Sequence, residues 1–328
     1  MSRLLSLPLL PPLLPPLLPP LLLPLLLPFL AGPVCRVLVM SLAPRRAVRL
    51  LVCSAAGLAA GSTAALALLV VPGATHLRPV AALGHLLTPL ASGSPVAAVV
   101  ITVVAASLLA AGGTLLLRDA HGWWRQLRRA RALAAGSRGE LVVLEQEHPD
   151  AYALPGRPGR IVITSGMLRA LSAAEREVLL AHERAHLRGR HHLLVATVEL
   201  AAHCHPGLRA VREPLRYALE RTADEAAARA VGDRRLTARA IGRAALAART
   251  SPARHRPGFA LAATAGPVPL RVAALLGQPA RTRVPGAPRR MAALTLLACL
   301  AVSAGASFQA ADNLHTGIEI AQGETGEE

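Results

Sequence analysis

The sequence predicts a mainly α-helical membrane protein that also carries a smaller α+β domain with a small β-sheet. Of its 328 residues, 53% are hydrophobic but only 2% are aromatic, and Leu, Ala and Val gather in long runs, as in membrane helices. Three runs without internal charge are long enough to cross a bilayer, at residues 50–71, 96–117 and 291–308. We therefore expect five regions. They are a low-complexity N-terminus (1–47), a two-helix transmembrane region (48–118), a soluble domain (119–289), a C-terminal transmembrane helix (290–309) and a short acidic tail (310–328).

The N-terminal region has a composition that argues against regular structure. Residues 4–30 consist almost entirely of Leu and Pro, built on the repeat Pro-Pro-Leu-Leu. Each proline removes a helical hydrogen bond, so the prolines recur too often for an α-helix. Unsatisfied backbone would also be costly in hydrocarbon. A polyproline II segment is one alternative, and a natural start further along, at Met40, is another; a cleaved signal peptide fits less well, because the apolar region is too long and interrupted by proline.

Basic residues set the expected orientation in the membrane. The formal net charge is +17, and every basic residue other than histidine is an arginine. Arginines precede the first run and follow the second, which places both flanks in the cytoplasm and residues 72–95 outside. Trp123 and Trp124 lie at the expected interface. Because no recognition motif or aromatic stacking platform accompanies the charge, we expect contact with membrane lipid and not with nucleic acid. The four cysteines form no C-x-x-C pair, so neither a disulfide framework nor a cysteine metal site is indicated.

Residues 172–224 contain the pattern that predicts chemistry. His182-Glu183-Arg-Ala-His186 is an H-E-x-x-H motif, and Ser172 with Glu175 forms a capping box that predicts a helix starting near Ala173. Histidines four residues apart share one face of a helix and can bind one metal ion, while Glu183 reaches toward a bound water. Downstream, Glu220 and Asp224 are again four residues apart on a predicted helix. We assign Glu220 as the third ligand and Asp224 as the acceptor for a ring N–H of one histidine.

Two imidazoles and one carboxylate with an open fourth position are the ligand set of a catalytic zinc ion, although another divalent ion would also suit these ligands. The alternative is a solvated helix that happens to carry two histidines. Further histidines follow the motif, and we expect them to be structural or interfacial: His191, His192, His203 and His205. The sequence does not choose an oxyanion-stabilising group among these histidines, Arg216 and Arg221.

The chain resembles membrane-integrated zinc metallopeptidases of the BlaR/MecR and HtpX types. The resemblance rests on residues 152–156 (Tyr-Ala-Leu-Pro-Gly), 160–168 (Arg-Ile-Val-Ile-Thr-Ser-Gly-Met-Leu) and 181–187 (Ala-His-Glu-Arg-Ala-His-Leu), and it covers residues 140–275 best. It implies zinc bound by His182, His186 and Glu220, with Glu183 as catalytic acid/base. It also implies a zincin-like endopeptidase domain, which the arginine flanks place on the cytoplasmic side. The penicillin-binding domain that BlaR-type sensors carry after the last span is absent from this sequence, so we do not expect β-lactam sensing.

The resemblance also implies a class of substrate. Its partners would be proteins or peptides, with a transcriptional repressor or the chain itself as substrate in signalling. A protease for membrane-protein quality control and a non-catalytic scaffold are the alternatives. In similar zinc proteases an edge strand before the motif helix holds the extended substrate. We expect strands at residues 140–144 and 160–164 with a loop between them, and the candidates for substrate binding are Arg160, Val162 and Thr164. A purely structural hairpin is the alternative for these residues.

Overall fold

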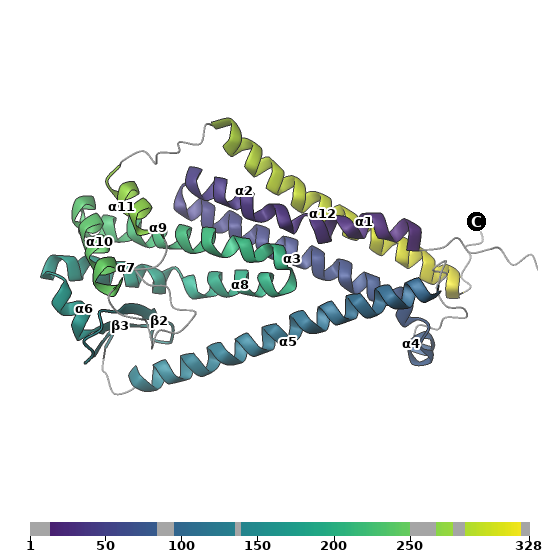
Figure 1. Ribbon diagram of the computed structural model, residues 1–328, viewed down its shortest axis with the longest axis horizontal. Helices are drawn as coiled ribbons and strands as arrows, with labels where there is room; N and C mark the ends of the chain where they lie inside the picture. The colour runs from purple at the N-terminus through teal and green to yellow at the C-terminus, as the bar shows by residue number, and fades with distance from the viewer. Residues whose placement is uncertain (1–13, 84–94, 135–138, 250–266, 278–285, 323–328) are drawn as a thin grey trace, which may run out of the picture.

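The computed structural model describes residues 14–83, 95–134, 139–249, 267–277 and 286–322. These residues are mostly helical and include a small three-stranded sheet, as the sequence predicts. Figure 1 shows long helices extending from one end of the molecule, and the sheet with the shorter helices gathered at the other end. The predicted linker at residues 251–258 lies outside the described residues.

Among the residues that the structure describes, four segments are long and apolar enough to cross a membrane, one more than the sequence predicts. Three correspond to the predicted spans but belong to longer helices: α3 (Pro44–Ala74), α5 (Pro95–Ala134) and α12 (Gly286–Gln322). Part of the expected tail, residues 310–322, is therefore helical. The fourth segment, Leu18–Ser41, falls in the N-terminal region.

The expectation that the Leu/Pro tract is not α-helical is wrong for the part that the structure describes. Helices α1 (Leu14–Leu26) and α2 (Pro28–Ser41) form there, and three prolines of α1 lie beyond its first turn. Other segments satisfy carbonyl groups at the junction of the two helices. The Ser62 hydroxyl donates to the Pro24 carbonyl at 2.8 Å, and His205 Nε2 lies 2.9 Å from the Leu25 carbonyl. Proline lacks the N–H group of a helical hydrogen bond, and the donors that replace it here come from segments distant in the sequence, which a local pattern does not reveal.

Small residues allow the long helices to approach one another closely. A Cβ atom at Gly57 of α3 would lie 2.7 Å from Leu300 of α12, and one at Gly61 would lie 2.3 Å from the Ser303 hydroxyl. Packing through small residues is a common basis of association between membrane helices. The short helix α4 (Arg78–Leu83) follows α3 at the end of the molecule far from the sheet (Figure 1).

The sheet has the order β1-β3-β2, which corrects the predicted arrangement. Strands β1 (Leu141–Leu144) and β3 (Arg160–Thr164) occupy the predicted segments and are parallel. The expected loop between them contains a further strand, β2 (Ala151–Leu154), which pairs antiparallel with β3. Strand β3 is therefore the central strand, and β2 lies at an edge. The prediction that residues 160–164 form an edge strand is wrong, because a four-residue strand between two turns carries too weak a period to be recognised.

The remaining helices surround the motif. They are α6 (Ser165–Ala170), α7 (Ala173–Arg188), α8 (His191–Cys204), the 3₁₀ helix η1 (Pro206–Val211), α9 (Arg212–Val231), α10 (Arg234–Arg249) and α11 (Val268–Leu275). Helix α7 begins at Ala173, as predicted. Helix α9 ends at Gly232, whose φ of 75° is the left-handed conformation that favours glycine at this position.

Candidate metal centre

Helix α7 carries the H-E-x-x-H motif, and its first turn is fixed by the predicted capping box. The Ser172 hydroxyl accepts the Glu175 N–H at 3.4 Å, and the Ser172 N–H donates to the Glu175 carboxylate at 2.9 Å. Arg243 of α10 lies 3.0 Å from the same carboxylate. These contacts set the rotation of α7, which buries His182, Glu183 and His186 on its inner face. The motif therefore faces the interior of the domain.

Helix α9 brings the downstream carboxylates to the same place. Its side facing α7 carries buried alanines, including Ala223 and Ala227, and such short side chains allow two helix backbones to lie close together. Glu220 and Asp224 project from this side and are almost fully buried. The spacing of four residues thus places both carboxylates against α7, as the sequence predicts.

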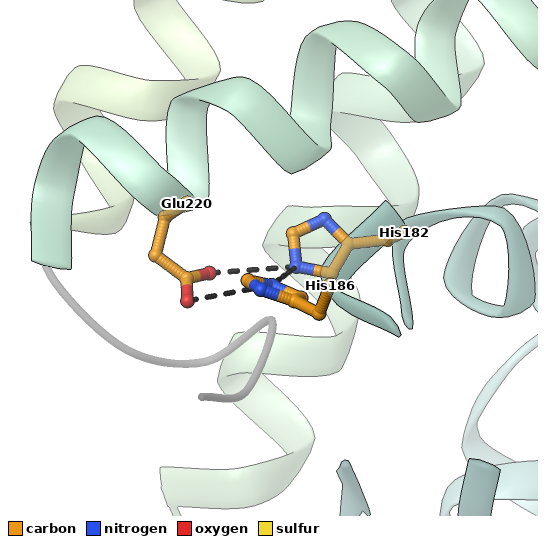
Figure 2. Close-up of side chains that lie close together, drawn as sticks. All are labelled: His182, His186 and Glu220. Carbon is orange, nitrogen blue, oxygen red and sulfur yellow. Dashed lines mark hydrogen bonds and ion pairs between the residues drawn. The ribbon is translucent and has the colours of Figure 1, made fainter. Parts of the chain in front are cut away.

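The three predicted ligands converge (Figure 2). The two Nε2 atoms of His182 and His186 lie 3.0 Å apart, and the Glu220 oxygens lie 3.4 Å from His182 Nε2 and 3.6 Å from His186 Nε2. Zinc–ligand bonds of about 2.1 Å in a tetrahedron place neighbouring ligand atoms about 3.4 Å apart. The three side chains are buried and present one ligand atom each within 4.8 Å of the others. These separations bracket the tetrahedral value, so the three residues could hold a metal ion such as zinc.

The net charge of the buried side chains also suits a divalent metal ion. Glu183, Glu220 and Asp224 are buried carboxylates, and the guanidinium of Arg271 is buried beside them. Buried charges are stable only when they are compensated. When both histidines are neutral, as metal ligands must be, one guanidinium leaves two negative charges unbalanced among these described residues, which is the charge that a divalent cation supplies.

A comparison with known protein families matches part of the chain. Residues 125–205 match the family described as Peptidase family M48. Peptidases of this family generally depend on zinc. No curated protein and no solved structure matches the chain. The matched segment includes His182, Glu183 and His186 and ends before Glu220. Together with the four apolar helices, it supports a membrane-associated metalloprotease, and it does not distinguish BlaR/MecR-type from HtpX-type relatives.

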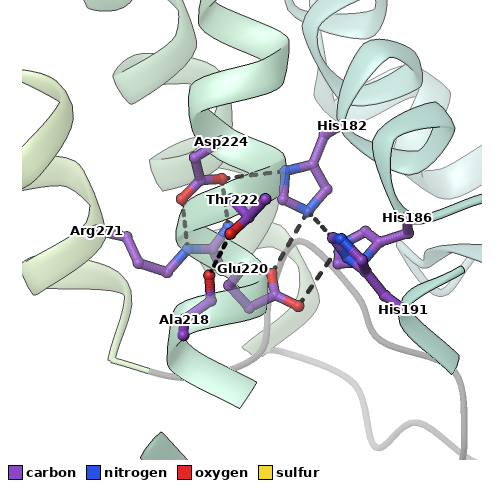
Figure 3. Close-up of polar contacts among 8 residues, drawn as sticks. All are labelled: His182, His186, His191, Ala218, Glu220, Thr222, Asp224 and Arg271. Carbon is purple, nitrogen blue, oxygen red and sulfur yellow. Dashed lines mark hydrogen bonds and ion pairs between the residues drawn. The ribbon is translucent and has the colours of Figure 1, made fainter. Parts of the chain in front are cut away.

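A charged network holds the ring of His182 (Figure 3). Its Nδ1 atom lies 3.0 Å from Asp224 Oδ1, and Arg271 of α11 donates two hydrogen bonds to the Asp224 carboxylate, at 2.8 and 2.6 Å. Arg271 also lies 3.0 Å from Glu220 Oε2. Burial alone would lower the pKa of His182, but Asp224 and Glu220 raise it to about 9. Burial raises the pKa of Asp224, but the stronger combined effect of Arg271 and His182 lowers it, which keeps the carboxylate ionised.

The ring of His186 has a different partner. Its Nδ1 atom lies 2.7 Å from Nδ1 of His191, the first residue of α8. The His191 ring is buried and lies against Gly189, where a Cβ atom would come within 2.4 Å of His191 Nε2. Burial first, then the positive charges of His182, His191 and Arg271, lower the pKa of His186 well below its usual value. His186 is therefore neutral, as a metal ligand must be.

Sequence reasoning missed Arg271 and His191 as parts of the centre. The sequence pattern gives Arg271 no role, because it follows the second helix at a distance that no local period spans. An arginine within an apolar segment, 0% exposed in the structure, is a signal in itself, because a buried arginine requires acidic partners. His191 had been expected to be structural or interfacial. Two other residues considered there lie elsewhere: His203 pairs with Asp119 at 3.0 Å, and Arg216 reaches Glu199 at 3.5 Å.

The three residues predicted to bind substrate have separate positions. Val162 is buried in a small apolar cluster with Val142, Tyr152 and Leu154. The Thr164 hydroxyl caps α6 by accepting the Met167 N–H and also bonds to the His148 carbonyl. Arg160 lines a surface cavity beside the metal centre. Of the three, only Arg160 thus lies where a substrate could reach its side chain.

Proposed function

We propose that the chain is a membrane-integrated zinc endopeptidase. The convergence of His182, His186 and Glu220 at zinc-ligand distances carries this proposal. The match to Peptidase family M48 over the motif helix supports the same chemistry. Zinc bound by these residues would polarise the scissile carbonyl and acidify a water molecule.

Glu183 is the residue we assign as general base and then general acid. It follows His182 on α7 and is buried in the same space. In this role its carboxylate takes a proton from the attacking water and delivers it to the leaving amine. Arg271 interacts electrostatically with Glu183. Burial lowers the pKa of Arg271, but the carboxylates of Glu220, Asp224 and Glu183 raise it.

We assign the binding of the peptide backbone to β2 instead of β3. Strand β2 lies at an edge of the sheet, and Ala153 of this strand lines a small cavity together with His186. An extended peptide that pairs with this edge would pass beside the metal centre. The edge-strand hypothesis is thus retained, but for residues 151–154.

The active site is proposed to face the cytoplasm. The arginines that begin α3 and those near the end of α5 flank the end of the molecule that holds the sheet, which agrees with the positive-inside rule. A reporter enzyme that is active only outside the cytoplasm tests this orientation. It should be active when fused within residues 84–94 and inactive when fused within residues 250–266. The reverse pattern would contradict the proposal.

Within this chemistry we favour a regulatory substrate, a transcriptional repressor or the chain itself, because the motifs resemble those of sensor-transducers. Self-cleavage is the form that can be tested first. A shortened product should appear in purified wild-type protein and be missing from Glu183→Gln. If the fragment pattern is the same in both, the chain does not cut itself.

The decisive experiment measures metal and activity together. Detergent-purified wild type should contain one zinc per chain and cleave an unfolded protein such as casein. His186→Ala and Glu220→Ala should lose the metal, whereas Glu183→Gln should retain it and lose turnover. Undiminished zinc in Glu220→Ala would overturn the ligand assignment. Full zinc in wild type without any difference in cleavage from Glu183→Gln would favour a non-catalytic scaffold.

A further inference from the structure

A large cavity opens beside the metal centre. It has a volume of about 1030 Å³ and lies between the end of α5, the turn from β2 to β3, and the junction of α7 and α8. Binding pockets for small ligands commonly measure about 300–1,000 Å³. This cavity is therefore large enough for several residues of an extended peptide.

The lining of the cavity is basic. It includes four arginines and no aspartate or glutamate: Arg131, Arg157, Arg160 and Arg190. Arg157 and Arg190 have exposed side chains, and no described acidic residue forms an ion pair with either of them. Burial and the charge of Arg190 lower the pKa of His192, which also lines the cavity. The cavity therefore has the positive charge that attracts carboxylates.

The cavity adjoins the site of the proposed reaction. Pro155, Leu187 and His192 line it and also line a second cavity of about 10 Å³, whose other walls include His186 and Ala153. The smaller cavity has room for about one water molecule. Strand β2 ends at Leu154, next to Pro155. A peptide paired with the edge of β2 would therefore leave that strand and enter the basic cavity.

Arg190 lines the cavity with its backbone in the left-handed conformation. Its φ of 47° is unusual for a residue other than glycine, and such conformations often occur at functional sites. Arg190 ends the turn from α7 to α8 and precedes His191, the partner of His186. The turn thus places a guanidinium in the cavity and an imidazole against a metal ligand.

We propose that this cavity is a specificity site for acidic side chains that flank the bond to be cleaved. Arginine suits this role because its planar guanidinium binds a carboxylate with two parallel hydrogen bonds. A phospholipid headgroup would also be attracted to guanidinium groups. We favour the peptide because the cavity shares walls with the small cavity that His186 lines and adjoins the end of β2. The inference rests on the proposed peptidase activity.

The test is a profile of cleavage sites in a peptide library made by digesting a proteome. Full-length wild-type protein in a neutral detergent should cleave preferentially where Asp or Glu lies on one side of the bond. For a pair of peptides that differ only by Glu and Gln, kcat/KM should differ by about tenfold at low salt, and the ratio should fall as salt screens the charges. The double variant Arg157→Gln, Arg190→Asn should lower this ratio toward one. Asparagine is used at position 190 because it tolerates positive φ.

Arg235 and Arg239, both exposed on α10, provide the matched control, and their replacement by glutamine should leave the ratio unchanged. Cleavage without acidic preference, or a preference that persists in the cavity variant, would overturn the cavity assignment while leaving the peptidase in place. The cavity variant could instead lose activity toward the Glu and Gln peptides equally, and only in bilayers that contain anionic lipid. That result would show that the cavity binds lipid. No difference in cleavage between wild type and Glu183→Gln would remove the proposed function and this inference with it.

Discussion

The two histidines of the metal centre are held in different ways. His182 contacts a carboxylate that is itself bound by Arg271, so its position depends on α7, α9 and α11 together. His186 contacts the imidazole of His191, only five residues further along the chain. One ring is thus fixed by a charged tertiary network and the other by a local turn. We infer that the first arrangement couples metal binding to the fold of the domain, and that the second mainly tunes one ligand.

Arg271→Met should have the largest effect. It removes the guanidinium that balances Glu220 and Asp224 and leaves both carboxylates buried. Removing one partner from a buried ion pair costs about 3–5 kcal/mol. We expect a large fall in the unfolding temperature of the detergent-solubilised protein and loss of bound zinc. Arg271→Lys should be intermediate, because lysine keeps the charge but not the paired geometry.

Arg239→Met is the matched control for general effects of losing an arginine, since Arg239 is exposed on α10. It should unfold at the wild-type temperature. Wild-type stability and zinc content in Arg271→Met would contradict the view that α11 is part of the centre.

Asp224→Asn should weaken metal binding next most strongly. In the place of Oδ1 the amide nitrogen would face both His182 and Arg271, which need an acceptor there, and in the place of Oδ2 it would face Arg271. Loss of a group that orients a metal ligand typically costs 10–100-fold in metal affinity, and we expect about 100-fold here because two contacts fail. Competition with a chromogenic chelator measures the change. An affinity within a factor of two of wild type would exclude an orienting role for Asp224.

His191→Leu should have a smaller effect, about tenfold in metal affinity. It removes the contact with His186 but leaves the charged network intact. His191→Asn offers an amide oxygen near the position of the lost Nδ1 atom and should recover much of the affinity. If leucine and asparagine behave alike, the contact at 2.7 Å does not orient His186.

The residues of the centre that could be predicted from the sequence are those that share a helix face. His182, Glu183, His186, Glu220 and Asp224 lie on two helices, and the period of a helix places residues four apart on one face. Arg271 reaches the centre from 47 residues beyond Asp224, and no local period connects them. The N-terminal helices were missed for a related reason. Their proline-rich backbone is completed by Ser62 and His205, which lie far away in the sequence.

The pH dependence of the metal-free protein should distinguish the two supports. Asp224 and Glu220 raise the pKa of His182 to about 9 despite burial. A raised pKa means that the folded state holds the proton more tightly. The resulting stability is fully present below the unfolded pKa of about 6.5 and is lost as pH rises through about 9. The gap in unfolding temperature between wild type and Asp224→Asn should therefore narrow on the alkaline side.

The gap in unfolding temperature between wild type and His191→Leu should not narrow on the alkaline side. Burial and neighbouring positive charges lower the pKa of His186, so its contribution is present above the usual histidine pKa and is lost as pH falls. Thermal unfolding after treatment with a chelator, measured from about pH 6 to about pH 9.5, covers the window for His182. A constant gap for Asp224→Asn across this window would show that Asp224 does not hold a proton on His182.

Gly189→Ala is the smallest change and the most specific test of the local support. The new Cβ atom would lie 2.4 Å from His191 Nε2 and 3.0 Å from the Ala185 carbonyl, so the His191 ring would have to leave its present position, which disturbs its contact with His186. The backbone at Gly189 has φ −75°, which alanine adopts without strain, and replacing glycine there restricts the unfolded chain. We therefore expect metal affinity to fall a few-fold while thermal stability is unchanged or slightly higher.

A lower metal affinity without lower thermal stability would indicate a displaced ligand, because general damage to the fold would lower both. In the His191→Ala background the ring atoms that meet the new Cβ are gone, so Gly189→Ala should no longer change the metal affinity. Such a double-mutant cycle isolates the interaction between the two positions. If the loss of affinity is the same in both backgrounds, Gly189 acts on the α7–α8 turn itself and not through the ring of His191.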